Sequence, residues 1–312
     1  MSNIKKIAVW GLGKHAINRI IPSLSKVSGL KLEGVCSRNA KTVKECSKKL
    51  NCHGWTNPED MLKKKDLDII FIATPIGLHA EQGKRVLLAG KHLWCEKPFT
   101  CNFLDSEELV KLSRINNLVV AEGFMYLYHE QYKKICDIIR TNQIGHIKEV
   151  NLKFGFPQLE NPGFRYDLHL GGGAFWDVGS YCISAALHLF ENEIVNVKYA
   201  NIKNSKDYKV DFDGTVILEF AGGSTVICSW YIGVGYRNEI DLWGENGSLY
   251  SDKIFSKIDG YNPKLRFRDK YGVETIDTLR PDNQFVQMFK KFLYMLKSND
   301  EAEKERENII RR

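Results

Sequence analysis

The chain has 312 residues and a formal net charge of +7, with 43% hydrophobic and 27% charged residues. At about 150 residues per domain, this length predicts two domains or one large one, and so apolar a composition excludes intrinsic disorder for most of the chain. No stretch of about 18 residues lacks charges, which excludes a transmembrane helix, and residues 1–7 contain neither an apolar signal core nor a small-residue cleavage site, which argues against secretion.

Short apolar runs alternate with helical patterns over residues 1–122, the expected first domain. Strands are predicted over residues 4–10, 30–36, 68–73, 92–95 and 118–121, and helices over residues 16–27, 59–64, 78–89 and 105–116, with a lysine-rich helix ending at Lys49. Trp55 and Pro58 fall in a connection. Repeated β–α alternation predicts an α/β fold, a doubly wound parallel sheet with right-handed crossovers.

The pattern changes over residues 123–312, the expected second domain. Helices are predicted over residues 129–141, 174–190 and 284–296, and strands over residues 194–202, 215–220, 225–230, 239–243, 248–251, 265–268 and 273–276. Strands in succession predict an α+β domain with a large, mostly antiparallel open sheet, in which Gly222-Gly223 and Asn246-Gly247 lie in hairpin turns. The last dozen residues are almost all charged or polar and indicate no final apolar helix.

Gly11-Leu12-Gly13-Lys14-His15-Ala16 is a G-x-G-x-x-A motif that follows a predicted strand and opens a predicted helix. In that context Gly11 allows the tight turn, and Gly13 lets the backbone approach a pyrophosphate. The helix N-terminus supplies amide donors. We therefore expect a dinucleotide to bind at residues 11–15; the alternative is a structural turn.

The end of the second strand indicates which dinucleotide binds. NAD-binding domains place an acidic side chain there for the ribose 2′-hydroxyl, but this strand ends Cys36-Ser37-Arg38-Asn39 and the next carboxylate is Glu45. Ser37 can hydrogen-bond a 2′-phosphate, and Arg38 can pair with it and stack on adenine. NADP(H) is expected in preference to NAD(H); the alternative for Arg38 is a solvent-exposed loop residue.

Two further strand ends carry polar residues, in Ala73-Thr74-Pro75 and Glu96-Lys97-Pro98. Loops at strand C-termini line the ligand crevice of a doubly wound sheet, so Thr74, Pro75 and Glu96 are expected to border the cofactor. His79 could contact the cofactor or be a capping or surface residue. Lys97 can exchange a proton with a reacting hydroxyl; the alternative is a surface salt bridge with Glu96.

Gly171-Gly172-Gly173 leads into a predicted helix on which Asp177, Tyr181, Ser184 and His188 form one polar stripe. Polar groups in such an apolar background need partners. Gly179 costs this helix about 1 kcal/mol, so we expect a flat group such as a nicotinamide ring to approach it. The alternative for the stripe is a Tyr–Asp hydrogen bond satisfied within the core.

Charge and cysteines exclude other classes of protein. The lysines are scattered rather than gathered in a basic stripe, so no nucleic-acid partner is expected, and no membrane partner either. The eight cysteines form no C-x-x-C pair, which disfavours a metal site. They are typical of reduced, mostly buried thiols in a cytoplasmic protein.

The chain resembles the glucose–fructose oxidoreductase/inositol dehydrogenase (Gfo/Idh/MocA) family over nearly its whole length. The resemblance is carried by Gly11-Leu12-Gly13, Ala73-Thr74-Pro75, Glu96-Lys97-Pro98, Glu122-Gly123-Phe124-Met125-Tyr126 and the segment from Gly171 to Tyr181. It implies an N-terminal Rossmann domain and a C-terminal domain with a large open sheet. It also implies oxidation or reduction of a carbinol or ketone carbon on a sugar, cyclitol or sugar nucleotide.

The resemblance implies roles for individual residues as well. Lys97 would orient the substrate hydroxyl and share its proton, and Tyr181 would be the principal acid/base. Asp177 would bind the substrate and polarise its neighbours. Segments that face the sugar contribute three more substrate-binding candidates: Tyr126, His129 and Arg165.

We therefore predict an enzyme that transfers a hydride reversibly between NADP(H) and a sugar-like carbinol carbon, with the proton moved by Lys97 and Tyr181. The alternatives are a regulator that binds NADP(H) without turnover and a structural or nucleic-acid-binding protein. Apolar residues on both faces of the strands over 225–230 and 239–243 predict an exposed sheet face. Such a face favours a homodimer or homotetramer formed through the C-terminal sheet.

Overall fold

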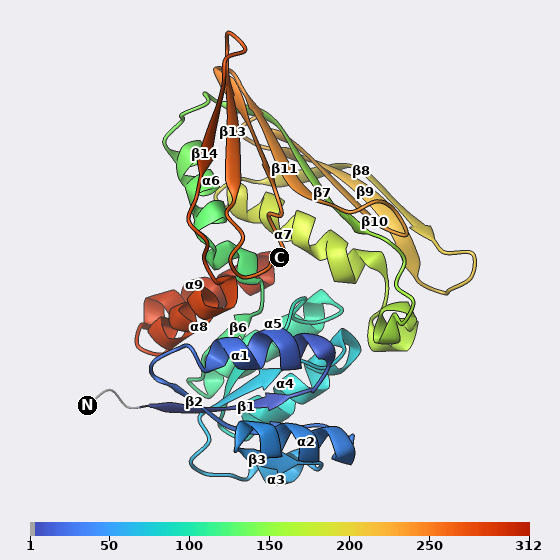
Figure 1. Ribbon diagram of the computed structural model, residues 1–312, viewed down its shortest axis with the longest axis vertical. Helices are drawn as coiled ribbons and strands as arrows, with labels where there is room; N and C mark the ends of the chain where they lie inside the picture. Colours follow the sequence, from blue (N-terminus) through green and yellow to red (C-terminus); the bar gives the residue numbers. More distant parts are fainter. Residues whose placement is uncertain (1–3) are drawn as a thin grey trace. The chain divides into compact units, whose positions relative to one another are not determined.

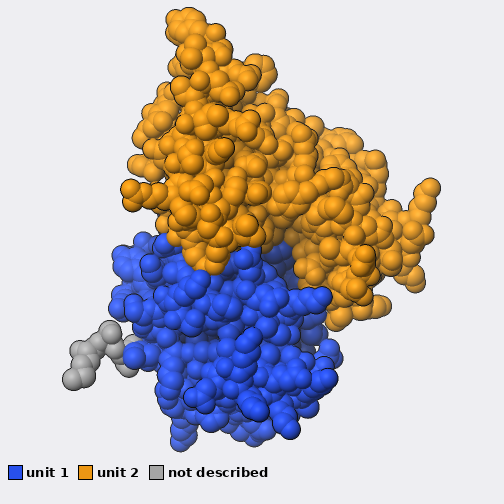
Figure 2. Space-filling model, viewed as in Figure 1, with its two compact units in different colours: residues 1–124, 285–311 blue, residues 125–284, 312 orange. Residues whose placement is uncertain are grey.

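The computed structural model describes residues 4–312; residues 1–3, from the segment that argues against secretion, lie outside the described part. The chain divides into two compact units (Figure 2). Unit 1 comprises residues up to 124 together with 285–311, and unit 2 comprises residues 125–284 and 312. No helix among residues 4–312 combines the length and the apolar character needed to cross a membrane.

Unit 1 is built on a six-stranded parallel sheet in the order β3-β2-β1-β4-β5-β6 (Figure 1). Its strands are β1 (Lys5–Trp10), β2 (Leu30–Cys36), β3 (His53–Trp55), β4 (Ile69–Ile72), β5 (His92–Cys95) and β6 (Val120–Glu122). Between them lie the π-helical turn η1 (Ala16–Ile20), which continues into α1 (Ile21–Leu24), and the helices α2 (Ala40–Leu50), α3 (Pro58–Leu62), α4 (His79–Leu88) and α5 (Phe103–Ile115). The doubly wound α/β prediction is confirmed. Strand β3 was not predicted, because its three residues are exposed or half-buried and carry no apolar run.

Helices cover the sheet of unit 1 because its central strands are apolar on both sides. All four residues of β4 are buried, as its continuous apolar run predicts. On one face, α8 (Gln284–Met295) presents Phe289 and Phe292 to Trp94, with ring centroids 4.7 and 4.4 Å apart. The helix predicted over residues 284–296 is confirmed as α8, and its aromatic side chains pack on the sheet.

The charged C-terminal segment also folds, as α9 (Asn299–Arg311), which lies against β6 and α5. Ala302 and Ile309, two turns apart, are buried. Arg306 is also buried, and its guanidinium donates to the Leu118 carbonyl at 2.7 Å and to Ser113 Oγ at 3.1 Å. No apolar helix was expected at this end of the sequence, and the helix that forms there is largely polar: a narrow apolar stripe and a paired arginine attach it to the sheet edge and α5.

Unit 2 is built on an eight-stranded sheet in the order β14-β13-β12-β11-β7-β10-β9-β8 (Figure 1). Its strands are β7 (Ile147–Phe156), β8 (Val195–Asn204), β9 (Asp211–Phe220), β10 (Thr225–Ile232), β11 (Arg237–Gly244), β12 (Gly247–Asp252), β13 (Lys264–Asp269) and β14 (Glu274–Thr278). The β7–β10 pair is parallel and the other pairs are antiparallel, which confirms the prediction of a mostly antiparallel sheet. The central strand β7 was not predicted, although buried and accessible residues alternate along much of it.

Helices pack on one face of this sheet. They are α6 (Glu130–Arg140) and α7 (Ser180–Leu189), the latter preceded by the π-helical turn η6 (Phe175–Gly179). Val226, Cys228 and Trp230 of β10 are buried, whereas the residues between them are accessible, so one side of the strand faces the helices. Predicted hairpins at Gly222-Gly223 and Asn246-Gly247 join β9 to β10 and β11 to β12.

Candidate functional site

The glycine motif lies at the carboxyl end of β1, where the chain turns into η1. Gly11 has φ +112°, and a Cβ there would lie 2.5 Å from the carbonyl carbon of Ala73, so only glycine fits. Gly13 is exposed, and a Cβ there would meet no described atom within 4 Å. Packing within the protein explains Gly11 but not Gly13. The free space beside Gly13 is where a dinucleotide pyrophosphate would approach the backbone.

The loops after β1 and β5 come together beside this motif. Leu12 is half-buried and Lys14 is exposed, and His15 Nε2 lies 3.6 Å from Glu96 Oε1. Glu96 Oε1 is buried and accepts no hydrogen bond among the described residues. A buried acceptor without a donor is uncommon in a native protein. A cofactor hydroxyl or carboxamide N–H would satisfy it, so the residues present fit a nicotinamide nucleotide.

Ser37 and Arg38 directly follow the end of β2. Ser37 is half-buried, and its hydroxyl accepts from the Asn39 N–H at 3.4 Å, while Asn39 caps α2 by accepting from the Thr42 N–H at 3.1 Å. Arg38 is exposed, and its guanidinium has no hydrogen bond or ion pair within the described part of the chain. An unpaired guanidinium beside a hydroxyl is a suitable set of donors for a phosphate.

The loop after β4 is held by α4. Thr74 Oγ1 donates to Gln82 Oε1 at 2.7 Å, and the Thr74 carbonyl lies 2.9 Å from His79 Nε2. Pro75 is half-buried and precedes a short helical turn. His79 is 1% exposed, with Nδ1 3.0 Å from the Pro98 carbonyl. Burial lowers the pKa of His79 below its usual value. His79 is therefore too buried to contact a ligand, and half-buried Thr74 is the residue of this loop that a cofactor can reach.

Lys97 is half-buried in the loop after β5. Its backbone N–H donates to Glu96 Oε2 at 3.3 Å, and the peptide bond between Lys97 and Pro98 is cis. The next residue, Phe99, donates its N–H to Glu122 Oε1 at 2.8 Å. The loop that carries the ammonium is thus fixed to β6 on one side and to His79 on the other.

In unit 2, two predicted substrate residues form an ion pair. Arg165 Nε donates to Asp177 Oδ2 at 2.7 Å, and their side chains are 33% and 17% exposed, so both keep an accessible edge. Asp211, which the sequence analysis did not single out, accepts from the Phe175 N–H at 2.6 Å at the start of η6. Burial raises the pKa of Asp211. No sequence pattern could have linked Asp211 to η6, because the two are far apart along the chain.

Tyr181 lies one turn after Asp177, at the start of α7. It is 6% exposed, and its hydroxyl donates to Met125 Sδ at 3.5 Å. Phe154 and Phe255 surround its ring, with centroids 5.4 and 5.5 Å away. An apolar surround of this kind fixes the orientation of the phenol.

Tyr126 and His129 lie deeper in unit 2. Both are fully buried; the Tyr126 hydroxyl is 2.6 Å from Ser184 Oγ, and burial raises the pKa of Tyr126 well above its usual value. His129 caps α6, with Nδ1 accepting from the Gln131 N–H at 3.0 Å. Burial lowers the pKa of His129 to about 4. Tyr126 thus contacts α7 through Ser184, and His129 caps α6.

The flat group that approaches Gly179 is the indole of Trp230, so the expectation of a nicotinamide ring there was wrong. A Cβ at Gly179 would lie 2.8 Å from this indole. Gly214, which is paired with Trp230 in the β9–β10 register, would place a Cβ 2.3 Å from the same ring. The indole is sandwiched between two glycines, one from η6 and one from β9. Gly179 is therefore a packing residue.

The eight cysteines are free thiols; Cys36, Cys95, Cys182 and Cys228 are buried and the other four are half-buried. Among the described residues, no three His, Cys, Asp or Glu side chains gather in a way that could hold a metal ion.

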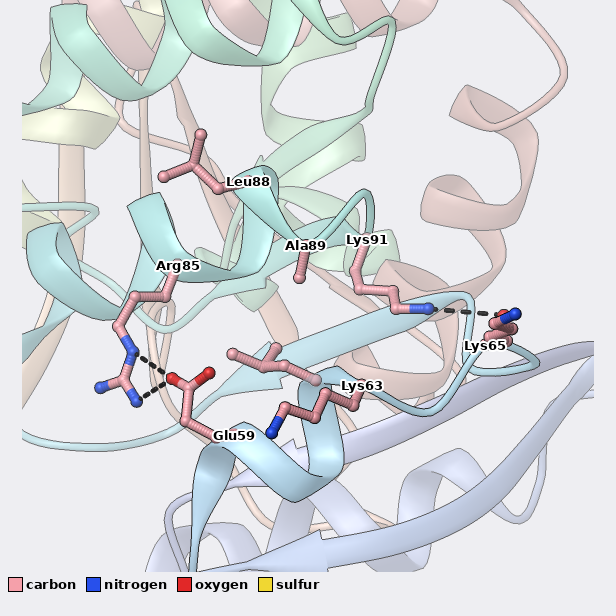
Figure 3. A pocket seen from close by; sticks show the side chains of 8 residues that line it. Glu59, Lys63, Lys65, Arg85, Leu88, Ala89 and Lys91 are labelled. Carbon is pink, nitrogen blue, oxygen red and sulfur yellow. Dashed lines mark hydrogen bonds and ion pairs between the residues drawn. The ribbon is translucent and has the colours of Figure 1, made fainter.

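A hollow of about 500 Å³ lies elsewhere on unit 1, between the C-terminal ends of α3 and α4 (Figure 3). Arg85 in it donates to Glu59 Oε1 at 2.6 Å, and Lys91 Nζ donates to the Lys64 carbonyl at 2.9 Å. Helix C-termini carry partial negative charge, which these cations offset. Its lining runs from Lys91, directly before β5, to Arg85, whose guanidinium lies over the ring of Trp10 at the end of β1.

Comparisons with known proteins identify both halves of the chain. Residues 5–124 match the model of an oxidoreductase family with an NAD-binding Rossmann fold, and residues 132–250 match the model of the GFO/IDH/MocA C-terminal domain. A curated relative is the dTDP-3,4-didehydro-2,6-dideoxy-α-D-glucose 3-reductase of Saccharopolyspora spinosa, which is 29% identical over 87% of this chain and 81% of that protein.

Two further proteins show the range of related activities. The scyllo-inositol 2-dehydrogenase (NADP+) of Bacillus subtilis (strain 168) is 27% identical over 90% of this chain and 85% of that protein. The crystal structure of a 3-ketoreductase from Actinomadura kijaniata in complex with NADP and TDP-benzene superposes with a TM-score of 0.94. That match has 26% sequence identity and covers 99% of this chain and 94% of the other.

Proposed function

The chain belongs to the Gfo/Idh/MocA family of oxidoreductases, and we propose that it reduces or oxidises a carbon of a sugar nucleotide with NADP(H). As a member of this family, it is an oxidoreductase of the dehydrogenase/reductase type that acts on CH–OH groups. The choice of a sugar nucleotide rests on the related dTDP-sugar 3-reductases. A free sugar or a cyclitol is the broader class, to which the relative from Bacillus subtilis points.

One observation carries the cofactor assignment. A Cβ at Gly13 would meet no described atom within 4 Å. Gly13 follows β1, Arg38 follows β2, and Glu96, whose Oε1 has no hydrogen bond among the described residues, follows β5; in the sheet β1 lies between β2 and β5. These three groups match a pyrophosphate, a 2′-phosphate and a ribose hydroxyl or carboxamide, respectively. NADPH, when bound, supplies the hydride for the carbonyl carbon.

The protein's own part is to deliver a proton and to stabilise charge on the substrate oxygen. In the reductive direction the carbonyl oxygen gains a proton as its carbon gains a hydride, and the product is an alcohol. We assign the proton to the Tyr181 hydroxyl, because an apolar surround holds that phenol in one orientation. Lys97 supplies the positive charge that stabilises an alkoxide-like oxygen, and it can share the proton.

The Arg165–Asp177 pair is assigned to substrate binding. Both side chains remain partly exposed, at 33% and 17%, so a sugar hydroxyl can reach the pair. Pairing also orients the Asp177 side chain before substrate arrives, which lowers the entropy lost on binding.

The test is turnover by the purified protein with NADPH and NADP+. Its panel should include dTDP-linked keto-sugars, free keto-sugars and cyclitols, and loss or gain of NADPH absorbance is the readout. Lys97→Met and Tyr181→Phe should each lower kcat by roughly 100-fold while NADPH affinity changes less than threefold. Lys84→Met and Tyr294→Phe, both at exposed positions, are the matched controls.

Two results would contradict this proposal. Wild-type kcat in both variants would remove the proton-transfer roles. Tight NADPH binding without turnover across the whole panel would instead indicate a regulator or redox sensor that uses the nucleotide as a signal.

We also propose that the protein is a homo-oligomer formed through the outer face of the unit 2 sheet. Trp243 of β11 is 65% exposed there, beside a hollow of about 660 Å³. Acidic Glu149 and Asp241 line one part of this hollow, and Arg266 and Arg268 line another. A surface that carries both negative and positive side chains can pair with a second copy of itself about a two-fold axis. Light scattering should give a dimer or tetramer, and Trp243→Glu should shift it to monomer.

A further inference from the structure

One buried side chain joins the two loops that carry the proposed chemistry of unit 1. His79, the first residue of α4, has Nε2 2.9 Å from the Thr74 carbonyl and Nδ1 3.0 Å from the Pro98 carbonyl. Thr74 follows β4, and Pro98 follows β5 directly after Lys97. A single imidazole ring therefore spans the ends of two neighbouring strands.

The ring has no nitrogen left for a ligand. It is 1% exposed, and each nitrogen already faces a backbone oxygen. Carbonyl oxygens only accept, so the ring holds a loop through whichever nitrogen carries a proton: one loop when neutral, both when protonated. Glu96 is the charged group whose field acts on the ring.

Neighbouring contacts make His79 the centre of a small clamp. Gln82, one turn further along α4, accepts from the Thr74 hydroxyl at 2.7 Å, so α4 holds Thr74 at both its side chain and its backbone. Glu122 holds the other loop from the opposite side by accepting from the Phe99 N–H. The backbone around Lys97 is thus fixed at two consecutive residues, Pro98 and Phe99.

We propose that His79 is a positioning residue: its ring sets the separation between the Thr74 loop and the Lys97 loop and touches neither cofactor nor substrate. The inference rests on the proposed function in one respect, since it requires Lys97 to act in hydride transfer. Displacement of a catalytic group by about 1 Å lowers rates by about 100-fold, so a loosened tie appears mainly in kcat.

The two halves of the tie can be separated by substitution. The Asn amide nitrogen takes the place of Nδ1, so His79→Asn keeps the bond to Pro98. The Gln amide nitrogen takes the place of Nε2, so His79→Gln keeps the bond to Thr74. His79→Leu has a similar volume and removes both ring contacts.

Each variant has its own expected result. His79→Leu should lower kcat by roughly 100-fold and raise the Kd for NADPH by about tenfold. His79→Asn should keep kcat within about fivefold of wild type and weaken NADPH binding, whereas His79→Gln should do the reverse. A role in folding alone would lower kcat and affinity together in all three variants, in proportion to lost stability.

The matched control is His92→Leu. His92, like His79, is a histidine of unit 1 with a backbone partner, but it is half-buried and lies at the amino end of β5, where Nδ1 accepts from the Val119 N–H at 3.0 Å. Its loss should lower the melting temperature and leave kcat and NADPH affinity within threefold of wild type.

Hydrogen exchange without any ligand separates this inference from the proposed function. His79→Leu should speed amide exchange in peptides covering residues 73–79 and 95–101, and His92→Leu should not. Unchanged exchange there, or wild-type kcat and NADPH affinity in folded His79→Leu, would overturn the tie. If the wild-type protein turns over no substrate, the proposed function fails, whereas the exchange result still decides whether His79 holds the loops.

Discussion

Two glycine-rich segments, one in each unit, lead into helices through π-helical turns, and they serve different purposes. Gly11 to Gly13 precedes η1 in unit 1, and Gly171 to Gly173 precedes η6 in unit 2. In unit 2 the glycines are explained by the protein itself: a Cβ would lie 2.6 Å from the Arg165 carbonyl oxygen at Gly172 and 2.2 Å from Asp211 Oδ1 at Gly173. In unit 1, Gly13 has no such neighbour among the described residues.

The comparison separates glycines that allow packing from glycines that allow binding. A glycine forced by a positive φ or a close backbone contact affects stability when it is replaced. Replacing a glycine that has free space around it in a strand-end loop changes stability little. The added side chain matters only when a ligand approaches the backbone. Substitutions can test each half of this distinction.

The largest effect is expected for Gly173→Ala. Its φ of +121° and the clash with Asp211 should together lower the free energy of unfolding by about 3 kcal/mol. Gly163→Ala is the control, because Gly163 has φ +61° but open space around its Cβ, and it isolates the backbone strain. Urea denaturation measures both. Equal losses in the two variants would show that the contact with Asp211 contributes nothing.

The next effect is on binding rather than stability. Gly13→Ala should weaken NADPH binding by about 30-fold, or about 2 kcal/mol, because the methyl group would occupy the space of the pyrophosphate. Its melting temperature should stay within about 1 °C of wild type. Gly235→Ala, at another glycine with open space and no positive φ, should change neither quantity. Unaltered NADPH affinity in Gly13→Ala would remove the central support for the cofactor site.

The sequence predicted unit 1 more completely than unit 2, and the reason is physical. A dinucleotide-binding turn and polar strand ends are local signals, so the motif at 11–16 and the segments around Thr74 and Lys97 could be located without contacts. The groups that fix η6, such as Asp211 and Trp230, come from distant strands of the sheet. Gly179 was misread for that reason: the flat partner is an indole from β10, which no local pattern reveals.

A buried charged group of unit 1 and one of unit 2 also differ in their hydrogen-bond partners. Glu96 Oε1 of unit 1 is buried and lacks a hydrogen bond among the described residues, with His15 Nε2 3.6 Å away. Lys257 of unit 2 is buried and donates to the Ile254 carbonyl at 3.0 Å, so its partner is the protein. Sequence reasoning placed Glu96 beside the cofactor but did not single out Lys257, and it could not show that either group is buried, because burial of a charge depends on the whole fold.

Lys257 predicts a pH dependence of stability. Burial lowers its pKa to about 7, against 10.5 for the free side chain. Below pH 7 both folded and unfolded chains carry the proton, and the folded chain bears the full cost of a buried charge. Between pH 7 and 10.5 the unfolded chain binds more protons, so this contribution to stability rises with pH. Lys257→Met should therefore stabilise the protein more at pH 6 than at pH 8, by roughly 1.4 kcal/mol. Lys264→Met, at the exposed first residue of β13, should show no such difference.

The smallest effect concerns which nucleotide unit 1 prefers. Arg38→Ala should weaken NADPH binding by about fivefold, or about 1 kcal/mol, and leave NADH binding unchanged, because the guanidinium is exposed and free to pair with a 2′-phosphate. Isothermal titration with both nucleotides measures the ratio, and Arg140→Ala, at an exposed position on α6, is the control. Equal weakening of both nucleotides would assign Arg38 to adenine stacking instead. Since no carboxylate lies between Gly34 and Lys44, Arg38→Ala should not create an NAD-specific site; it should only remove the preference.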